Sequence, residues 1–167
     1  MNPRKASNGR ARPPGAPRLP KCKKLPHLPV IWAHPGNEIF FITICCRPRR
    51  QSQLCRHFVA DEIFASVKFR NENKIWFAYF VALMPDHVHA LISFPFERPM
   101  TQVIPDWKRF LATKLKIKWQ RDFFDHRLRR HESYGEKEDY IRANPVRAGL
   151  IRAKENWPYF WQPESQT

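Results

Sequence analysis

The pattern of apolar and polar residues predicts a strand, a helix and two further strands in the first half of the chain. Phe40 to Cys46 is aromatic and β-branched, which favours a strand. Apolar residues three and four apart predict an amphipathic helix over about His57 to Arg70. Ile75 to Leu83 has no charge and no alternation, as expected of a strand covered on both faces, while His87 to Ser93 is short and alternating. The last two strands should be neighbours joined by a tight turn.

The second half of the pattern adds a helix, a strand and a last helix. A helix with one apolar and one basic face is expected where large apolar residues recur every four positions, at Trp107, Leu111, Leu115 and Trp119. Phe123 to Leu128 is expected to form a strand, and Tyr134 to Ala143 a helix followed by a short turn that stops at Gly149. This order predicts an α+β fold, a ferredoxin-like split βαβ sandwich with helices on one face of an antiparallel sheet, plus a C-terminal helix.

The residues before and after this pattern differ from it in composition. Residues 1–35 hold eight Lys or Arg, no Asp or Glu and eight of the sixteen prolines, which predicts an extended, disordered basic arm. The arm either follows phosphates or only keeps the protein in solution. We expect one folded domain over 36–155 and a tail over 156–167.

The charge of the chain favours a polyanionic partner. Thirty Lys and Arg against fifteen Asp and Glu give a formal charge of +15, and nucleic acid is the commonest partner of such a protein. A membrane is the rival, but the longest apolar run, Ile75 to Pro85, is shorter than the ~18 residues of a spanning helix. Without an apolar leader, the protein is expected in the cytoplasm, close to the nucleoid.

The four cysteines point to no zinc or disulfide framework. They include an adjacent pair and no Cys-x-x-Cys spacing, so they are expected to act as small apolar residues: Cys22, Cys45, Cys46 and Cys55.

The sequence His87-Val88-His89 is a candidate metal site. On a strand, side chains at i and i+2 project from the same face about 7 Å apart, so two imidazoles can converge on one ion. Val88, Ala90 and Ile92 would then face the helices. Two solvated histidines on a polar sheet face remain the alternative. An amidohydrolase would need a longer barrel domain, and a metallo-hydrolase would need an acid where Leu91 stands.

Three motifs in order resemble one known family. They are Met84-Pro85-Asp86-His87-Val88-His89, then Asp125-His126-Arg127-Leu128-Arg129, then Tyr140-Ile141-Arg142-Ala143-Asn144-Pro145-Val146-Arg147-Ala148-Gly149-Leu150. Together they resemble the REP-associated tyrosine transposases, a branch of the HUH single-strand DNA transposases. The likeness covers about residues 36 to 158. The segment after Trp157-Pro158 departs from the family pattern, so contacts of the tail are expected to differ.

The resemblance implies a reaction and a set of residues. His87 and His89 would hold Mg²⁺ or Mn²⁺, and Tyr140 would be the nucleophile. In related transposases an amide one turn later completes the metal site; that position is Asn144 here, although Asn144-Pro145 is equally a helix cap. The activity implied is a metal-dependent endonuclease and strand transferase that forms a 5′-phosphotyrosine. Tyr134 is the competing nucleophile.

The substrate implied is single-stranded or hairpin DNA from a repetitive extragenic palindrome, bound by a monomer or homodimer. Basic residues that could contact the DNA are Lys108, Arg109, Lys114, Lys118, Arg127, Arg129 and Arg130. A solvated basic face is the alternative for each of them. Two other functions remain open: a catalytically silent hairpin-binding protein descended from a transposase, and a metal-dependent phosphoesterase that uses water.

Overall fold

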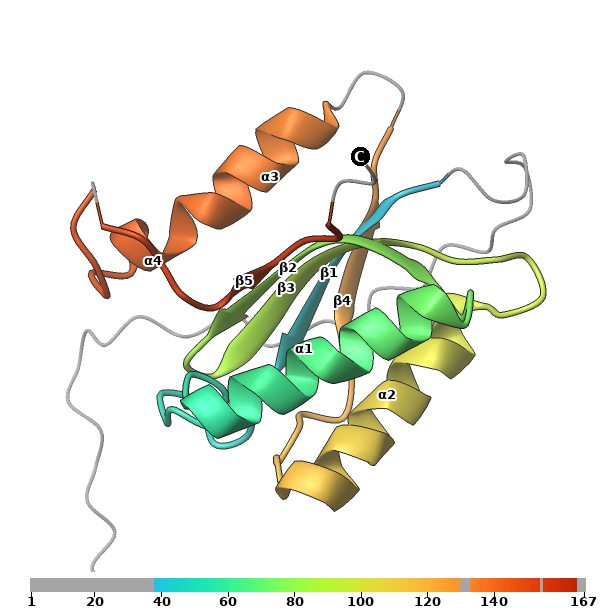
Figure 1. Ribbon diagram of the computed structural model, residues 1–167, viewed down its shortest axis with the longest axis horizontal. Helices are drawn as coiled ribbons and strands as arrows, with labels where there is room; N and C mark the ends of the chain where they lie inside the picture. Colours follow the sequence, from blue (N-terminus) through green and yellow to red (C-terminus); the bar gives the residue numbers. More distant parts are fainter. Residues whose placement is uncertain (1–37, 130–132, 154, 165–167) are drawn as a thin grey trace, which may run out of the picture.

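The computed structural model describes residues 38–129, 133–153 and 155–164 as one antiparallel sheet with helices on both faces (Figure 1). The predicted basic arm, Cys22 and Arg130 lie outside these residues. The elements in chain order are β1 Phe40–Cys45, α1 His57–Glu72, β2 Phe77–Met84, β3 His87–Ser93, α2 Met100–Leu115, β4 Phe124–Arg127, α3 Tyr134–Arg142, α4 Asn144–Arg147 and β5 Phe160–Trp161.

The strand order is β4-β1-β3-β2-β5, with every pair antiparallel. The first four strands have the order of a split βαβ sandwich, so the predicted α+β fold class is confirmed. As predicted, β2 and β3 are neighbours joined by a tight turn. Helices α1 and α2 cover one face, and α3 lies over the other (Figure 1). The sheet therefore has two covered faces of different kinds.

The face under α1 and α2 holds the main core. Its strand residues alternate, with Ile42 and Ile44 on β1 and the predicted Val88, Ala90 and Ile92 on β3 all buried. Trp76 and Trp107 meet edge to face with ring centroids 5.0 Å apart. The indole N–H of Trp107 donates to Ser66 Oγ at 2.8 Å, so the buried polar group is satisfied. This face supplies most of the apolar burial.

The helix expected around Trp107 to Trp119 is displaced toward the N-terminus. Helix α2 begins at Met100 and ends at Leu115, because Lys116 adopts a left-handed φ of 59°. Trp119 is therefore not on the helix, and it forms a β-bridge with Cys46. The backbone after α2 runs beside the end of β1, where Gln120 N–H donates to Cys45 O at 2.8 Å. Bridge formation with β1 overrides the helical spacing.

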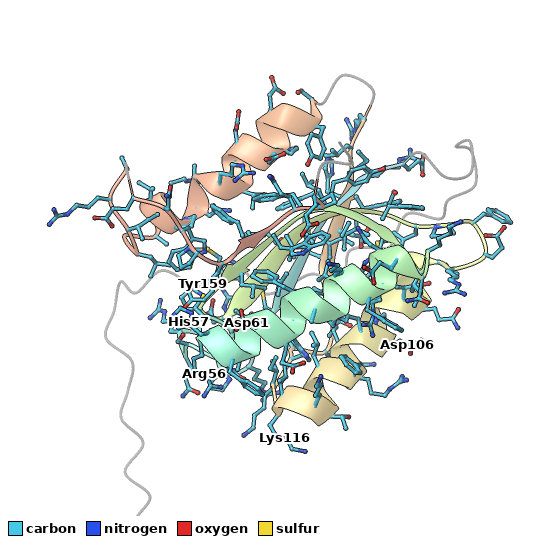
Figure 2. All side chains as sticks on the ribbon, viewed as in Figure 1. Arg56, His57, Asp61, Asp106, Lys116 and Tyr159 are labelled. Atoms are coloured by element: carbon cyan, nitrogen blue, oxygen red, sulfur yellow. The ribbon has the colours of Figure 1, made fainter. Side chains whose placement is uncertain are left out.

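The segment expected as a tail contains a fifth strand. Phe160 and Trp161 pair with Ala82 and Val81 of β2, and the Trp157 indole donates to Leu83 O at 2.9 Å. Tyr159 lies beside His57 at the first turn of α1, with ring centroids 6.0 Å apart (Figure 2). Residues 157 to 161 thus form a strap along the β2 edge. No helix of the described chain has the length and apolar character to cross a bilayer.

Candidate active site

His87 and His89 occupy the sheet face opposite α1 and α2. In the β1–β3 register, Cys45 lies opposite His87, Thr43 opposite His89, and Phe41 opposite Leu91. Opposed residues of antiparallel strands share a face. We call this side, which α3 partly covers, the catalytic face, because the reaction proposed below would take place on it.

Each histidine is held through its Nδ1 atom. His87 Nδ1 donates to the Asp86 carboxylate at 2.8 Å, and His89 Nδ1 is hydrogen-bonded to Thr43 Oγ1 at 2.9 Å. The two Nε2 atoms face each other at 3.2 Å. The ring orientations are therefore set by neighbours outside the pair, as is usual for metal-binding histidines.

Asp86 anchors the pair from the turn between β2 and β3. Burial alone would raise the pKa of Asp86, but the Arg50 N–H at 2.7 Å, His87 and the Arg49 guanidinium at 3.0 Å lower that pKa below its ordinary value. Asp86 is thus an ionised carboxylate and a pure acceptor. His87 Nδ1 must carry the proton, which leaves the lone pair on Nε2.

Both imidazoles are neutral at neutral pH. Burial lowers the pKa of His89 to about 3, with smaller contributions from His87 and Arg49. Burial also lowers the pKa of His87, although Asp86 opposes that shift. The Thr43 hydroxyl can donate or accept, so it tolerates either tautomer of His89, including the one with a free Nε2 lone pair.

The Nε2 pair fits a divalent cation. Adjacent nitrogen ligands of an octahedral ion, each at ~2.1 Å, lie about 3 Å apart, which is close to the 3.2 Å observed. Within the described residues, no group of three or more His, Cys, Asp and Glu side chains surrounds a common point. Any further protein ligand would therefore come from another residue type.

Asn144 has unused hydrogen-bonding capacity. Its Nδ2 atom is buried without a partner. It lies one helical turn after Tyr140, and helical hydrogen bonding continues from Asp139 through Ala143 to Arg147. The amide is therefore on the same side of this helical segment as Tyr140.

The ring of Phe41 lies between Tyr140 and His89 and contacts both. The Tyr140 side chain is 46% exposed. Phe41 meets the Tyr140 ring edge to face at 6.4 Å between centroids and stacks on His89 at 5.4 Å. The Arg147 guanidinium lies 4.8 Å from the Tyr140 ring centre. The phenol is thus accessible on the catalytic face.

The helix carrying Tyr140 is fixed by an N-terminal cap and by burial. Ser133 Oγ accepts from the Glu136 N–H at the first turn of α3. Ile141 is fully buried in a small apolar cluster with Phe80, Ala82 and Leu91. Because Ile141 adjoins Tyr140 in sequence, its burial constrains how far the tyrosine can rotate from the sheet.

Arg142 ties the same helix to the strap. Its guanidinium bonds to Glu138 Oε1, with Nε at 2.7 Å, and to Gln162 Oε1 at 2.8 Å. It also lies 4.3 Å from the Phe80 ring centre and 5.4 Å from that of Phe160. One residue thereby joins α3, β2 and β5.

The other described tyrosines are less suited to nucleophilic attack. Burial and a hydrogen bond with Glu138 raise the pKa of Tyr134 above its ordinary value, which disfavours the phenolate. Tyr134 also packs against Tyr79, 5.9 Å between ring centroids. Tyr159 donates its hydroxyl to Cys55 O at 3.2 Å.

The predicted DNA-contacting residues are scattered rather than gathered at the histidines. Arg109 pairs with Asp106, and Lys114 with Glu62, on the helices behind the sheet. Lys118 follows α2, near the end of β1 that pairs with His87. Arg127 of β4 pairs with Glu38 at 2.9 Å, and Arg129 is exposed just beyond it.

Lys108 differs from the sequence expectation. Its side chain is buried, and its ammonium donates to the carbonyl oxygens of Gln120 at 2.9 Å and Arg121 at 2.8 Å. Burial lowers its pKa. Lys108 therefore fixes the segment after α2 and does not belong to an exposed basic face.

Sequence reasoning missed the residues that orient the site. Thr43 and Phe41 carry no motif of their own, and only strand register places them beside His89. Asp86 directly precedes His87, and that adjacency was an available signal. Two cations that contact site residues, Arg49 beside Asp86 and Arg147 beside Tyr140, lie in the β1–α1 loop and in α4.

The chain is similar in sequence to two known proteins and similar in fold to a solved structure. No model of a protein family matches the chain. It is 25% identical over 138 residues to a protein of Haemophilus influenzae provisionally named a REP-associated tyrosine transposase, covering 72% of this chain and 77% of that protein. It is 28% identical over 131 residues to the REP-associated tyrosine transposase of Escherichia coli, covering 72% and 73%.

A solved structure shares the fold. It is a REP-associated tyrosine transposase bound to a REP hairpin, with a TM-score of 0.64 at 20% identity, covering 80% of this chain and 82% of that one.

Proposed function

We propose that this chain, which is similar to REP-associated tyrosine transposases, cuts and rejoins single-stranded DNA at a hairpin, with Tyr140 as nucleophile. The observation that carries the proposal is an exposed phenol joined to a neutral histidine pair through Phe41. Exposure gives the phenol access to a phosphate. Tyr140 contacts Phe41, and the β1–β3 register places Phe41 on the same sheet face as the histidines.

His87 and His89 are proposed to hold Mg²⁺ or Mn²⁺ through their Nε2 atoms, with the side-chain amide oxygen of Asn144 as the third protein ligand. The bound ion would polarise a non-bridging phosphate oxygen. Asp86 and Thr43 keep the two Nε2 atoms convergent, so the protein does not reorganise the rings when DNA arrives.

In the proposed reaction, the Tyr140 oxygen forms a bond to phosphorus as the bond to the 3′-oxygen breaks. The phenol gives up its proton, and the departing 3′-oxygen gains one. The DNA stays attached to Tyr140 through its 5′-phosphate. Attack by another 3′-hydroxyl reverses these bond changes, so rejoining needs no nucleotide cofactor.

The proposed substrate is a DNA hairpin of the repetitive extragenic palindrome kind with a single-stranded flank. The fold shared with a hairpin-bound transposase and the formal charge of +15 support this proposal. We propose that the protein acts on this DNA in the cytoplasm, as a monomer or a homodimer.

A covalent adduct tests the proposal. The full chain is incubated with Mn²⁺ and hairpin DNA labelled at the 3′ end of its cleaved strand, because that fragment keeps the 5′-phosphate. A labelled protein band on a denaturing gel is expected. The band should vanish with chelator and in Tyr140→Phe, and persist in the matched control Tyr134→Phe.

The other outcomes identify other functions. Cutting without an adduct would show that water is the nucleophile. Hairpin retention without cutting, across Mg²⁺ and Mn²⁺, would show a silent binding protein. An adduct that still forms in Tyr140→Phe would show that another residue is the nucleophile.

A further inference from the structure

Within the part of the chain that the structure describes, the catalytic face is open toward β4, and an exposed aromatic ring stands at this opening. Phe124 begins β4, the edge strand at one side of the sheet, and is 42% exposed. On the β2 side, by contrast, Phe80 is fully buried beneath α3, and Ile141 of α3 is fully buried in the same cluster. Nothing in the proposed cleavage reaction uses Phe124.

Strand register places Phe124 in line with the histidine pair. Phe124 lies opposite Thr43 on β1, and Thr43 lies opposite His89 on β3. All three side chains therefore share the catalytic face. Two strand spacings separate β4 from β3, so Phe124 stands about 10 Å across the sheet from His89. A base on a nucleotide next to a phosphate held at the histidines spans a gap of this order.

The ring belongs to an aromatic group that includes the nucleophile. Phe41 contacts Phe124 edge to face at 6.2 Å, Tyr140 edge to face at 6.4 Å, and His89 by stacking at 5.4 Å. Phe41 is thus supported from three directions, and it backs Phe124 while leaving part of that ring exposed. A flat ligand can bind on the exposed part without displacing the group.

We propose that Phe124 is a stacking platform for one unpaired base of the bound DNA, on a nucleotide adjacent to the scissile phosphate. This inference rests on the proposed function. Aromatic side chains bind the π-face of any base, so the platform would hold single-stranded DNA in place without reading its sequence. It would also exclude paired DNA, whose bases stack on each other.

Fluorescent base analogues test this platform without any cleavage. The Tyr140→Phe chain is mixed, in chelator, with a set of hairpins that each carry one 2-aminopurine in the single-stranded flank. Stacking on a ring changes the emission of this base, and we expect a large change at one flank position. Phe124→Ala should remove that change, and Phe124→Trp should keep it.

Phe69→Ala is the matched control, because Phe69 is 57% exposed on α1, across the sheet. It should leave the emission profile unaltered. Replacing the responding nucleotide with an abasic one should weaken binding of the parent chain about tenfold. The same replacement should cost the Phe124→Ala chain almost nothing, since its partner ring is already gone.

Two results would overturn the platform. In the first, Phe124→Ala keeps the emission change, or the abasic nucleotide weakens both proteins equally. In the second, Phe124 mediates a concentration-dependent dimer that the alanine variant loses, which would assign the ring to a contact between copies. An adduct assay run in parallel keeps the two proposals separate: stacking without an adduct refutes the cleavage reaction, and an adduct without stacking refutes only the platform.

Discussion

The two faces of this sheet are built from alternate residues of the same strands, yet they are covered in opposite ways. Under α1 and α2, side chains such as Ile42, Val88 and Trp107 are excluded from water. On the α3 side of the sheet, two histidines are hydrogen-bonded to polar partners, and Tyr140 and Phe124 remain about half exposed. The comparison shows that adjacent residues of one strand can have different roles. Those on one face stabilise the fold, and those on the other face form the candidate site.

Neighbouring residues of β3 give the sharpest test of that division. His87→Ala should lower DNA cutting by at least about a thousandfold, because it removes one of the three proposed metal ligands. Hairpin affinity should stay within about tenfold, since phosphate contacts dominate binding. Cutting and affinity are measured on the same labelled hairpin. Cutting that survives the change would refute the metal assignment.

Val88→Ala is the companion variant, one residue along on the other face. It should cost about 2 kcal/mol of unfolding free energy, because Val88 is fully buried, and leave the adduct yield per folded molecule unchanged. Urea titrations of both variants compare the two faces directly.

The largest effect on unfolding free energy should come from the face covered by α1 and α2. Trp107→Ala removes a fully buried indole that packs on Trp76 and donates to Ser66. A loss of about 3–5 kcal/mol is expected from chemical denaturation. Tyr140→Phe, on the other face, should shift the same transition by under about 0.5 kcal/mol. Similar losses in the two variants would contradict the division of labour between faces.

Arg142 tests how firmly the partly open face is held. Arg142→Ala removes the contacts that tie α3 to Gln162 and Phe160, together with the bond to Glu138 within the helix. The adduct should form roughly tenfold more slowly at saturating DNA, because Tyr140 is less often in position. DNA affinity should change little. The control is Arg109→Ala, which removes an exposed cation of α2 and should preserve the rate.

The smallest expected effect concerns alkaline pH on the buried face. Burial is the main cause that raises the pKa of the Cys46 thiol from 9.0 to about 12. The unfolded thiol ionises first as pH rises, so the native state loses stability from about pH 9 upward. Between pH 8 and 9.5 the loss from this group should be about 1 kcal/mol. Urea midpoints of the parent chain should therefore fall more over this interval than those of Cys46→Ala.

Local sequence signals accounted for most of the fold. The alternation in His87 to Ser93 separated the two faces of β3 correctly, because each side chain faces its own environment. Gly149, with a φ of +69°, stands where the helical turn was expected to stop. The strand order followed from the sequence of elements, since split βαβ topology allows few alternatives.

What the sequence left open depends on contacts between distant residues. Thr43 and His89 are 46 positions apart, and no local pattern links a lone threonine to a histidine. Trp119 has the spacing of the helix in the sequence, but it lies outside the helix and forms a β-bridge with Cys46. The strap at Phe160 pairs with the free edge of β2, and edge pairing of two residues has almost no sequence signature.

The placement of the strap also bears on when the enzyme acquires its site during translation. A ribosome makes β1, β2 and β3, with both helices of the main core, well before residues 157 to 162. Domains can begin to fold as they emerge. The nascent chain can therefore bury the core while the tyrosine helix still lacks Phe160 and Gln162 as anchors for Arg142. A growing chain would thus carry its histidine pair before the helix of Tyr140 is firmly placed, so the cutting proposed for this protein would wait until synthesis has passed the strap.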